Sequence, residues 1–294
     1  PAPHPPATLG LQLHTPPTPF FGRAQELALI AERLADPACR LLTIVGPGGI
    51  GKTRLAIQAA SMAAEQFPHG VYFVDLSAVA TAEQIPSAML AALAAPRYGV
   101  LDQWRPLLDY VHTRHLLLVL DNFEHLLPEV DWLVELLQAA PQIKVLVTSR
   151  ARLNLRQEWL IPLEGMALPP GTASDTLHGP LPGLAVADLE RYDALHFFLR
   201  SVRRLQPTFQ PAPADIAAIL HICQLLEGMP LGIELAATWV RSLPLRTIAS
   251  EIEHGLHFLT TSLHDIPTRH RSMSAVFDHS WRLLSPRERS ILRQ

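Results

Sequence analysis

The stretch GPGGIGKT, residues 46–53, has the residue types and the spacing of a loop that binds phosphate. It follows the apolar run LLTIV at 41–45, and a helical pattern of apolar residues begins behind it. Glycines let consecutive backbone N–H groups turn towards a phosphate, and the N-terminus of the next helix adds partial positive charge. Lys52 would then reach the β- and γ-phosphates of a nucleotide, and the Thr53 hydroxyl would hold Mg²⁺.

A glycine-rich turn with a lysine nearby is the alternative interpretation of this stretch. It explains neither the spacing nor the strand and helix patterns on either side, so we favour a nucleotide-phosphate site. The residues predicted to line it are Gly46, Pro47, Gly48, Gly49, Ile50, Gly51, Lys52, Thr53 and Arg54.

The apolar run LLLVL at 116–120 leads directly into Asp121. Ligands of open α/β sheets bind at the carboxyl ends of the strands, where this carboxylate would lie. Asp121 would hold Mg²⁺ there, through water, while Thr53 binds it from the loop. The alternative is an aspartate that caps the turn after its strand. A phosphate loop needs a metal partner on another strand, which favours the metal role.

Asn122 stands where many nucleotide hydrolases carry a second acid. A carboxylate at that place orients the attacking water and accepts its proton, whereas an asparagine can orient the water but cannot accept the proton. We therefore expect slow hydrolysis of ATP. Glu124 reaches the water if the loop curls back, and otherwise it is an exposed acid at the start of a helix, which is the favoured alternative.

Five short apolar runs alternate with helical segments in the first half of the chain. Runs of this length are typical of strands buried on both faces of a parallel sheet. The sequence therefore predicts an α/β fold over residues 20–167, preceded by a proline-rich extended tether at 1–19. The predicted strands are LLTIV (41–45), VYFVDL (71–76), LLLVL (116–120), KVLVTS (144–149) and LIPL (160–163).

The second half of the chain is predicted to be helical. Residues 168–183 are rich in Pro, Gly, Ser and Thr, which indicates a linker. Apolar residues then recur at helical spacing, and we expect a small all-α domain at 184–265. Gly228 follows one of these helical patterns and Pro230 opens the next, as at a tight corner between two helices.

The composition sets broad limits on function. The chain has 24 Lys and Arg against 27 Asp and Glu, a net charge of −3, so no strong field points to nucleic acid or to an anionic membrane. No apolar run is long enough to span a membrane.

Cys39 and Cys223 form neither a disulfide framework nor a zinc pattern, which favours a cytoplasmic protein with both thiols buried. His112 and His115 lack a third ligand at a suitable spacing, so we interpret them as surface residues.

Five motifs follow one another along the chain: FFGR (20–23), GPGGIGKT (46–53), LLLVLDNFEH (116–125), VLVTSR (145–150) and GMPLGIELAA (228–237). Taken in order, they resemble the STAND class of signal-transduction ATPases, and within it the NB-ARC (AP-ATPase) group of the bacterial multidomain regulator type. The phosphate loop alone is generic, but the five together are specific. The resemblance implies a P-loop NTPase sheet of the ASCE type in which the strand at 144–149 lies between the phosphate-loop strand and the Asp121 strand.

The resemblance also implies roles for residues outside the phosphate loop. Arg150 would contact the γ-phosphate and so report whether a third phosphate is present, because its planar fork of donors fits a terminal phosphate. The alternative is a surface arginine that is paired with an acid and has no role in binding. The nucleotide base would lie between the helix start at Pro230 and Leu231 and the stretch Phe21, Gly22 and Arg23.

Residues 266–294 resemble the start of the family's winged-helix domain, cut short before the family's Met-His-Asp motif. The sequence FDHS at 277–280 is not that motif. Arginines in this region alternate with acidic and apolar residues, which favours a solvated helix face over a nucleic-acid surface.

The function implied is a molecular switch. ADP would hold the α/β and helical domains closed, and exchange for ATP would open the module for self-association and signalling. Mg²⁺ is expected with ATP and need not be ordered with ADP. Effector and sensor domains would lie outside this segment, and their output is open. The alternative is a constitutive P-loop ATPase or a kinase, but neither a base in an acceptor pocket nor a lid of basic residues is evident.

Overall fold

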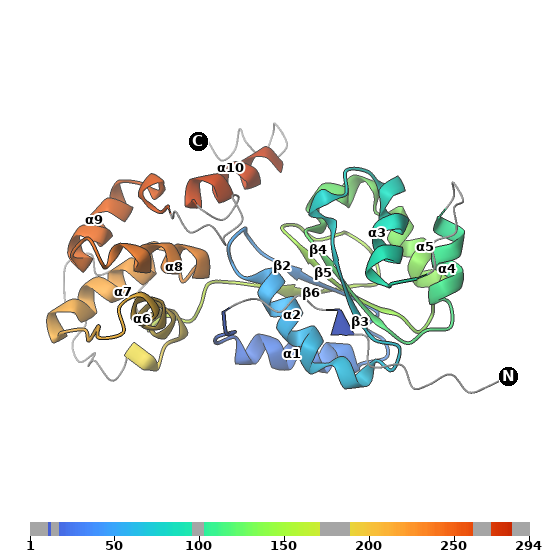
Figure 1. The fold of residues 1–294 in the computed structure, drawn as a ribbon, viewed down its shortest axis with the longest axis horizontal. Helices are drawn as coiled ribbons and strands as arrows, with labels where there is room; N and C mark the ends of the chain where they lie inside the picture. The colour runs from blue at the N-terminus through green and yellow to red at the C-terminus, as the bar shows by residue number, and fades with distance from the viewer. Residues whose placement is uncertain (1–10, 13–17, 96–102, 171–188, 261–271, 284–294) are drawn as a thin grey trace. The chain divides into compact units, whose positions relative to one another are not determined.

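The computed structural model describes residues 11–12, 18–95, 103–170, 189–260 and 272–283 (Figure 1). These residues divide into two compact units, and each is described by itself. The first unit holds the sheet and comprises the described residues up to Phe20, then Ala24–Gly46 and Lys52–Leu163. The second unit is helical and comprises Phe21–Arg23, Pro47–Gly51 and the chain from Glu164 onwards. The division thus falls four residues before the predicted boundary at 167.

All five predicted strands are present in the first unit, and all pair in parallel. The strand order is β1-β3-β4-β5-β2-β6. The predicted position of β5 between the phosphate-loop strand and the Asp121 strand is therefore confirmed. The five strands are β2 (Leu41–Val45), β3 (Val71–Asp75), β4 (Leu117–Asp121), β5 (Lys144–Ser149) and β6 (Glu158–Pro162).

The segment predicted as an extended tether contributes a sixth strand. Residues Leu11–Gln12 form β1, which pairs in parallel with β3 at Val71 and Tyr72. The prediction of a tether without a packed element was wrong at this point. An exposed strand edge offers unpaired backbone groups to any extended segment nearby, and a proline-rich chain is already extended.

Helices cover both faces of the sheet (Figure 1). Three of them share one hydrophobic cluster with alternate strand residues such as Leu118, Leu120 and Val147. Because successive strand residues point to opposite faces, Val119 and Leu146 are buried on the other face, where α2 packs against β4 and β5. The helices of this unit are α1 (Ala24–Ala35), α2 (Lys52–Met62), α3 (Ile85–Ala92), α4 (Trp104–Val111) and α5 (Asp131–Ala139).

The second unit is built from helices around its own core, as the sequence predicted. Its buried residues include the predicted helical stripes, among them Leu195, Ile219 and Ile233. Gly228 has a φ of +66°, in the left-handed region, and Pro230 is the first residue of the next helix, so the predicted corner is confirmed. The helices are α6 (Asp193–Leu205), α7 (Ile216–Leu225), α8 (Pro230–Trp239), α9 (Leu245–His254) and α10 (Met273–Leu283).

Short 3-10 helices connect several of these elements. They are η1 (Ala64–Gln66), η2 (Leu76–Ala78), η3 (Ala82–Gln84), η4 (Phe123–Glu129), η6 (Pro213–Asp215) and η7 (Leu256–Phe258). Residues 171–183 of the predicted linker at 168–183 lie outside the described residues, and so does most of the predicted winged-helix start, of which only residues 272–283 are described.

The two cysteines lie in the interior of their units. Cys39 and Cys223 are both buried free thiols, as predicted, and burial raises the pKa of each. Among the described residues, none of the helices combines the length and apolar character that crossing a membrane would require.

Candidate functional site

The phosphate loop leaves β2 at its carboxyl end and enters α2, which begins at Lys52. Gly49 and Gly51 have φ values of +80° and +99°, a region that side chains with a Cβ rarely adopt. The Gly46 N–H donates to the Ser149 carbonyl oxygen at 3.3 Å, which ties the start of the loop to the end of the neighbouring strand β5. The loop therefore has the strand, glycine and helix arrangement that a phosphate site needs.

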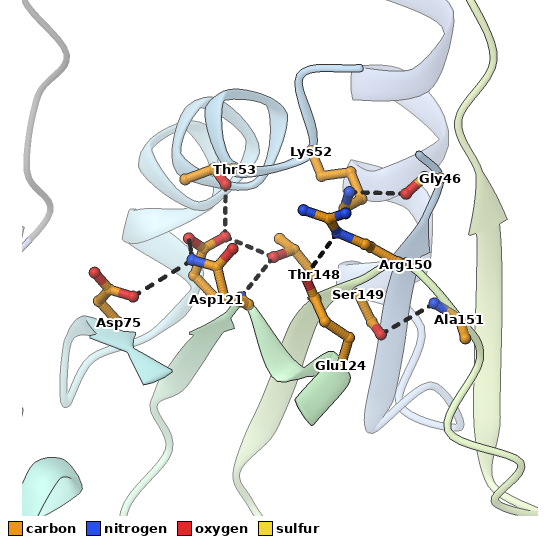
Figure 2. Close-up of polar contacts among 11 residues, drawn as sticks. Gly46, Lys52, Thr53, Asp75, Asp121, Glu124, Thr148, Ser149, Arg150 and Ala151 are labelled. Atoms are coloured by element: carbon orange, nitrogen blue, oxygen red, sulfur yellow. Dashed lines mark hydrogen bonds and ion pairs between the residues drawn. The ribbon is translucent and has the colours of Figure 1, made fainter. Parts of the chain in front are cut away.

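Lys52 lies against the loop that precedes it. Its Nζ donates to the Gly46 carbonyl oxygen at 2.8 Å (Figure 2). Burial is the main cause that lowers the pKa of Lys52, Glu124 and Asp121 raise it, and the charge of Arg150 lowers it; together they bring the pKa to about 8. At pH 7 most Lys52 side chains still carry their proton and positive charge, so Lys52 can serve as a cation that binds phosphate.

Asp121 ends β4 and is the most connected carboxylate of the site, with 2% of its surface exposed. Its Oδ1 accepts from the Thr53 hydroxyl at 2.7 Å and from the Thr148 hydroxyl at 2.5 Å (Figure 2). Burial raises the pKa of Asp121, whereas the two hydroxyl donors lower it. The two residues predicted as metal ligands, Thr53 and Asp121, are therefore in direct contact.

This oxygen pair fits Mg²⁺, which binds proteins through one or two carboxylates and takes its remaining ligands from phosphates and water. Among the described residues no three His, Cys, Asp or Glu side chains gather as a metal cage. A metal at this place would thus depend on Thr53, Asp121 and the nucleotide itself. When bound, it would neutralise part of the negative charge of the phosphates.

Asn122 follows Asp121 with φ +61° and ψ +49°, a left-handed conformation that asparagine tolerates. Its backbone N–H donates to the Thr148 hydroxyl at 3.1 Å. Its side-chain amide donates to Asp121 Oδ2 at 2.8 Å and to Asp75 Oδ1 at 3.4 Å. The amide is thus held between two carboxylates, a place where a second acid would be repelled.

Asp75 and Thr148 are two members of this cluster that the sequence analysis missed. Asp75 ends β3 directly opposite Asp121 in the strand register, and Thr148 is the next-to-last residue of β5. A signal was present in the sequence: both residues stand at the carboxyl ends of predicted strands, the edge where ligands bind.

Glu124 and Arg150 form an ion pair in which Arg150 Nε lies 3.0 Å from Glu124 Oε1 (Figure 2). Arg150 follows β5 directly, at the carboxyl edge of the sheet where it was predicted. The Glu124 side chain is 7% exposed and that of Arg150 is 17% exposed. The favoured interpretation of Glu124 as an exposed helix-start acid was therefore wrong: Glu124 does lie in the first turn of η4, but its carboxylate is largely buried and paired with Arg150.

Residues Phe21–Arg23 of the FFGR stretch belong to the second unit and make several contacts within it. The guanidinium of Arg23 is buried and donates to the carbonyl oxygens of Glu164 at 2.6 Å, Gly165 at 3.4 Å and Ile50 at 3.5 Å. The ring of Phe21 packs edge-on against His196 of α6, with 4.7 Å between ring centroids. Through these contacts both side chains stabilise the second unit. Their role beside a nucleotide base stays a prediction.

The start of α8 touches the phosphate loop within the same unit. The Leu231 N–H donates to the Gly49 carbonyl oxygen at 3.3 Å. A Cβ at Gly49 would lie 3.1 Å from Leu231 side-chain atoms, and one at Gly51 would lie 4.0 Å from Pro230. Within this unit the structure thus brings Pro230 and Leu231 together with Gly51 and Gly49 of the predicted phosphate loop.

The Arg54 side chain contacts the segment that precedes α1. Its guanidinium donates to the Thr18 hydroxyl at 2.8 Å and to the carbonyl oxygens of Thr18 and Pro19 at 2.5 Å and 2.9 Å. These bonds fasten the segment before α1 to the helix that follows the phosphate loop. A contact of Arg54 with phosphate would accordingly come from its backbone N–H.

The chain is similar in sequence to one protein family and to several bacterial regulators. A family described as AAA domain matches residues 36–155. A Mycobacterium tuberculosis protein named as an HTH-type transcriptional regulator is 34% identical over 263 residues, which cover 87% of this chain and 26% of that protein. The regulatory protein AfsR of Streptomyces griseus is 30% identical over 163 residues, covering 50% of this chain and 16% of AfsR. The chain thus spans about a quarter or less of the length of these relatives.

Among solved structures, the ORC2 protein of Aeropyrum pernix, in ADPNP and ADP complexes, matches with a TM-score of 0.50 and 17% identity. The match covers 82% of this chain and 71% of that protein, and at this identity it concerns the fold alone. Together with the AAA family match and the strand order, it leads to one conclusion: the α/β part of this chain has the P-loop NTPase fold, and the ligands this family implies are a nucleotide and, usually, Mg²⁺.

Proposed function

We propose that this chain is the nucleotide-dependent switch module of an NB-ARC-type STAND regulator. ADP holds it in a closed state, and exchange for ATP permits opening, self-association and signalling. The observation that carries the proposal is the cluster at the carboxyl edge of the sheet. There the cation of Lys52 lies over the phosphate loop, the oxygens of Thr53 and Asp121 touch, and Arg150 stands after the intervening strand.

Each of these groups has a task in this proposal. Lys52 and the loop N–H groups bind the phosphates, and Thr53 with Asp121 holds Mg²⁺ when ATP is present. Arg150 contacts the third phosphate, so the site distinguishes ATP from ADP. Pro230, Leu231 and the FFGR residues Phe21, Gly22 and Arg23 flank the base.

Slow hydrolysis follows from Asn122. Its amide donates to Asp121 and Asp75, and it cannot accept a proton from water. A site that binds its nucleotide firmly and cleaves it slowly suits a switch better than a motor or a kinase, whose turnover runs at about 1–100 s⁻¹ in kinases.

The output of the switch is proposed from the relatives. The 34% identical protein carries the name of an HTH-type transcriptional regulator and AfsR that of a regulatory protein. Control of transcription by a DNA-binding unit elsewhere in the whole protein would agree with those names. The net charge of −3 gives this segment itself no field that attracts nucleic acid.

The test is to purify the chain, identify any nucleotide that it retains, and measure turnover and mass in solution. We expect retained ADP and turnover far below about 1 s⁻¹. Lys52→Ala should abolish retention because the phosphates lose their buried cation. Arg203→Ala, which removes an exposed cation on α6, is the control and should retain ADP as the unaltered chain does.

Two results would contradict the proposal. Nucleotide retention that survives Lys52→Ala would mean that the phosphates bind elsewhere. A chain that retains no nucleotide and turns over ATP faster than about 1 s⁻¹ would favour a constitutive ATPase or a kinase.

A further inference from the structure

The ion pair between Glu124 and Arg150 lies at the carboxyl edge of the sheet, inside the predicted nucleotide site, with the side chains 7% and 17% exposed. One carboxylate oxygen of Glu124, Oε1, accepts from Arg150 Nε at 3.0 Å. The other, Oε2, is buried and has no hydrogen-bond partner among the described residues. A buried carboxylate oxygen without a donor is costly, so its retention calls for a reason beyond the stability of the fold.

The charges around the pair suggest that reason. The pKa of Lys52 is raised by Glu124 and lowered by Arg150, so both charges act on the lysine of the phosphate loop. Glu124 thus offsets two cations that a nucleotide would use for its phosphates. A terminal phosphate brings the same kind of acceptor to the same guanidinium, with more negative charge.

We propose that Glu124 competes with the terminal phosphate of ATP for Arg150, and so sets the preference of the site for ADP over ATP. This inference rests on the proposed function, in which Arg150 contacts the third phosphate. With ADP the pair stays as the structure shows it. With ATP, Arg150 must leave Glu124, and the breaking of a buried ion pair counts against ATP binding.

The position of the two residues supports this competition. Arg150 follows β5 and Glu124 follows the neighbouring strand β4, three residues after Asp121. Both thus emerge at the strand ends where a ligand binds, and both side chains are largely withdrawn from water. An ion pair that only stabilised the surface would be exposed and would contribute little.

The experiment measures, with Mg²⁺ present, the affinity of the nucleotide-free chain for ADP and for a non-hydrolysable ATP analogue. Glu124→Gln keeps the shape of the side chain and removes its charge. We expect the ratio of ATP-analogue to ADP affinity to rise by about tenfold, within the range of about 5–150-fold common for coupled sites. Glu129→Gln, the same change at the exposed end of η4, should leave the ratio as it is.

A double-mutant cycle separates competition from a general change in charge. Arg150→Gln should lower the affinity for the ATP analogue and leave that for ADP nearly unchanged. In the Arg150→Gln background, Glu124→Gln should no longer raise the ratio, because the group that is competed for is gone. A ratio that rises equally in both backgrounds would overturn the proposal.

Other outcomes also decide the matter. If Glu124→Gln leaves the ratio unchanged or lowers it while Lys52→Ala abolishes binding, the competition is wrong and the nucleotide site stands. If Lys52→Ala binds nucleotide as the unaltered chain does, the proposed function itself fails. Should Glu124→Gln not fold, Glu124→Asp applies the same test: its shorter carboxylate holds Arg150 less firmly, so the ratio should rise by a smaller factor, and an unchanged ratio overturns the proposal.

Discussion

At the scale of single residues, the polar cluster around Asp121 shows how one amide changes the chemistry of a site. Asn122 donates to Asp121 and to Asp75, and its backbone adopts a left-handed conformation. The amide thus neutralises no charge but separates two carboxylates that would repel each other. The same residue that removes a proton acceptor also stabilises the arrangement of the acids.

Asn122→Asp is expected to raise the turnover of ATP by tenfold or more, since a positioned general base contributes about 10²–10⁴-fold. The new carboxylate would face Asp121 and Asp75, so the variant should also unfold at a lower temperature. Steady-state hydrolysis and thermal unfolding measure the two effects. Asn154→Asp is the control, because Asn154 also has a left-handed backbone, with φ +60°.

Unchanged hydrolysis in Asn122→Asp would contradict this reading of the site. If Glu124→Gln then abolished the residual hydrolysis, the proton acceptor would be Glu124.

At the scale of elements, adjacent strands decide which buried hydroxyls are useful. Thr43 on β2 and Thr148 on β5 are both fully buried, yet only Thr148 reaches an acceptor, the Asp121 carboxylate on β4. The hydroxyl of Thr43 has no hydrogen-bond partner among the described residues. The register of the strands, rather than the residue type, makes this difference.

Thr148→Val should lower the free energy of unfolding of the sheet unit by about 1.5–3 kcal/mol, the usual contribution of a hydrogen bond to a charged group. Thr43→Val is the matched control and should be neutral or stabilising, because it removes a buried hydroxyl that has no partner. Denaturant unfolding at neutral pH compares the two. Equal losses of stability would show that the Asp121 bond contributes nothing specific.

A crossing of backbone segments in the helical unit gives a second test at this scale. A Cβ on Gly165 would lie 1.8 Å from the Glu227 carbonyl oxygen. Gly165→Ala therefore requires a backbone shift and should destabilise this unit by about 1–3 kcal/mol or more.

Gly232→Ala is the control for this crossing. Its new Cβ would meet a methyl group of Leu226 at 3.0 Å, which can move, and alanine favours the helix interior by about 0.5–1 kcal/mol. Thermal unfolding should rank the two variants far apart. A Gly165→Ala chain as stable as the original would contradict the close approach.

At the scale of the whole molecule, the phosphate loop is shared by both compact units. Gly46 and Lys52 belong to the sheet unit, whereas the residues between them, Pro47–Gly51, belong to the helical unit. The loop is one continuous stretch of backbone, so we expect a ligand bound along it to stabilise its residues whichever unit they are assigned to.

Saturating ADP is therefore expected to stabilise both units together, by about 2.7 kcal/mol at a concentration one hundred times the dissociation constant. Calorimetry with and without ADP measures the shift, and Lys52→Ala should remove it. Stabilisation of one unit while the other unfolds unchanged would argue against a ligand shared through the loop.

The sequence by itself determined the elements and the phosphate loop. Hydrophobic period and glycine spacing are local properties, so the five main strands, the helical character of the second half, the corner at Gly228 and Pro230, and the place of Asp121 at a strand end could be predicted. The short strand β1 escaped prediction, because two residues carry no period and depend on a free sheet edge.

Only the tertiary structure decided how the polar groups are paired. Glu124 meets Arg150, Thr148 meets Asp121, Asn122 reaches Asp75, and Arg54 holds Thr18, although these partners are far apart in the chain or look unremarkable in sequence. Strand register and burial set these pairs, and neither is written in the spacing of residues along one segment. The competition proposed for Arg150 thus became visible only once two neighbouring strand ends were placed side by side.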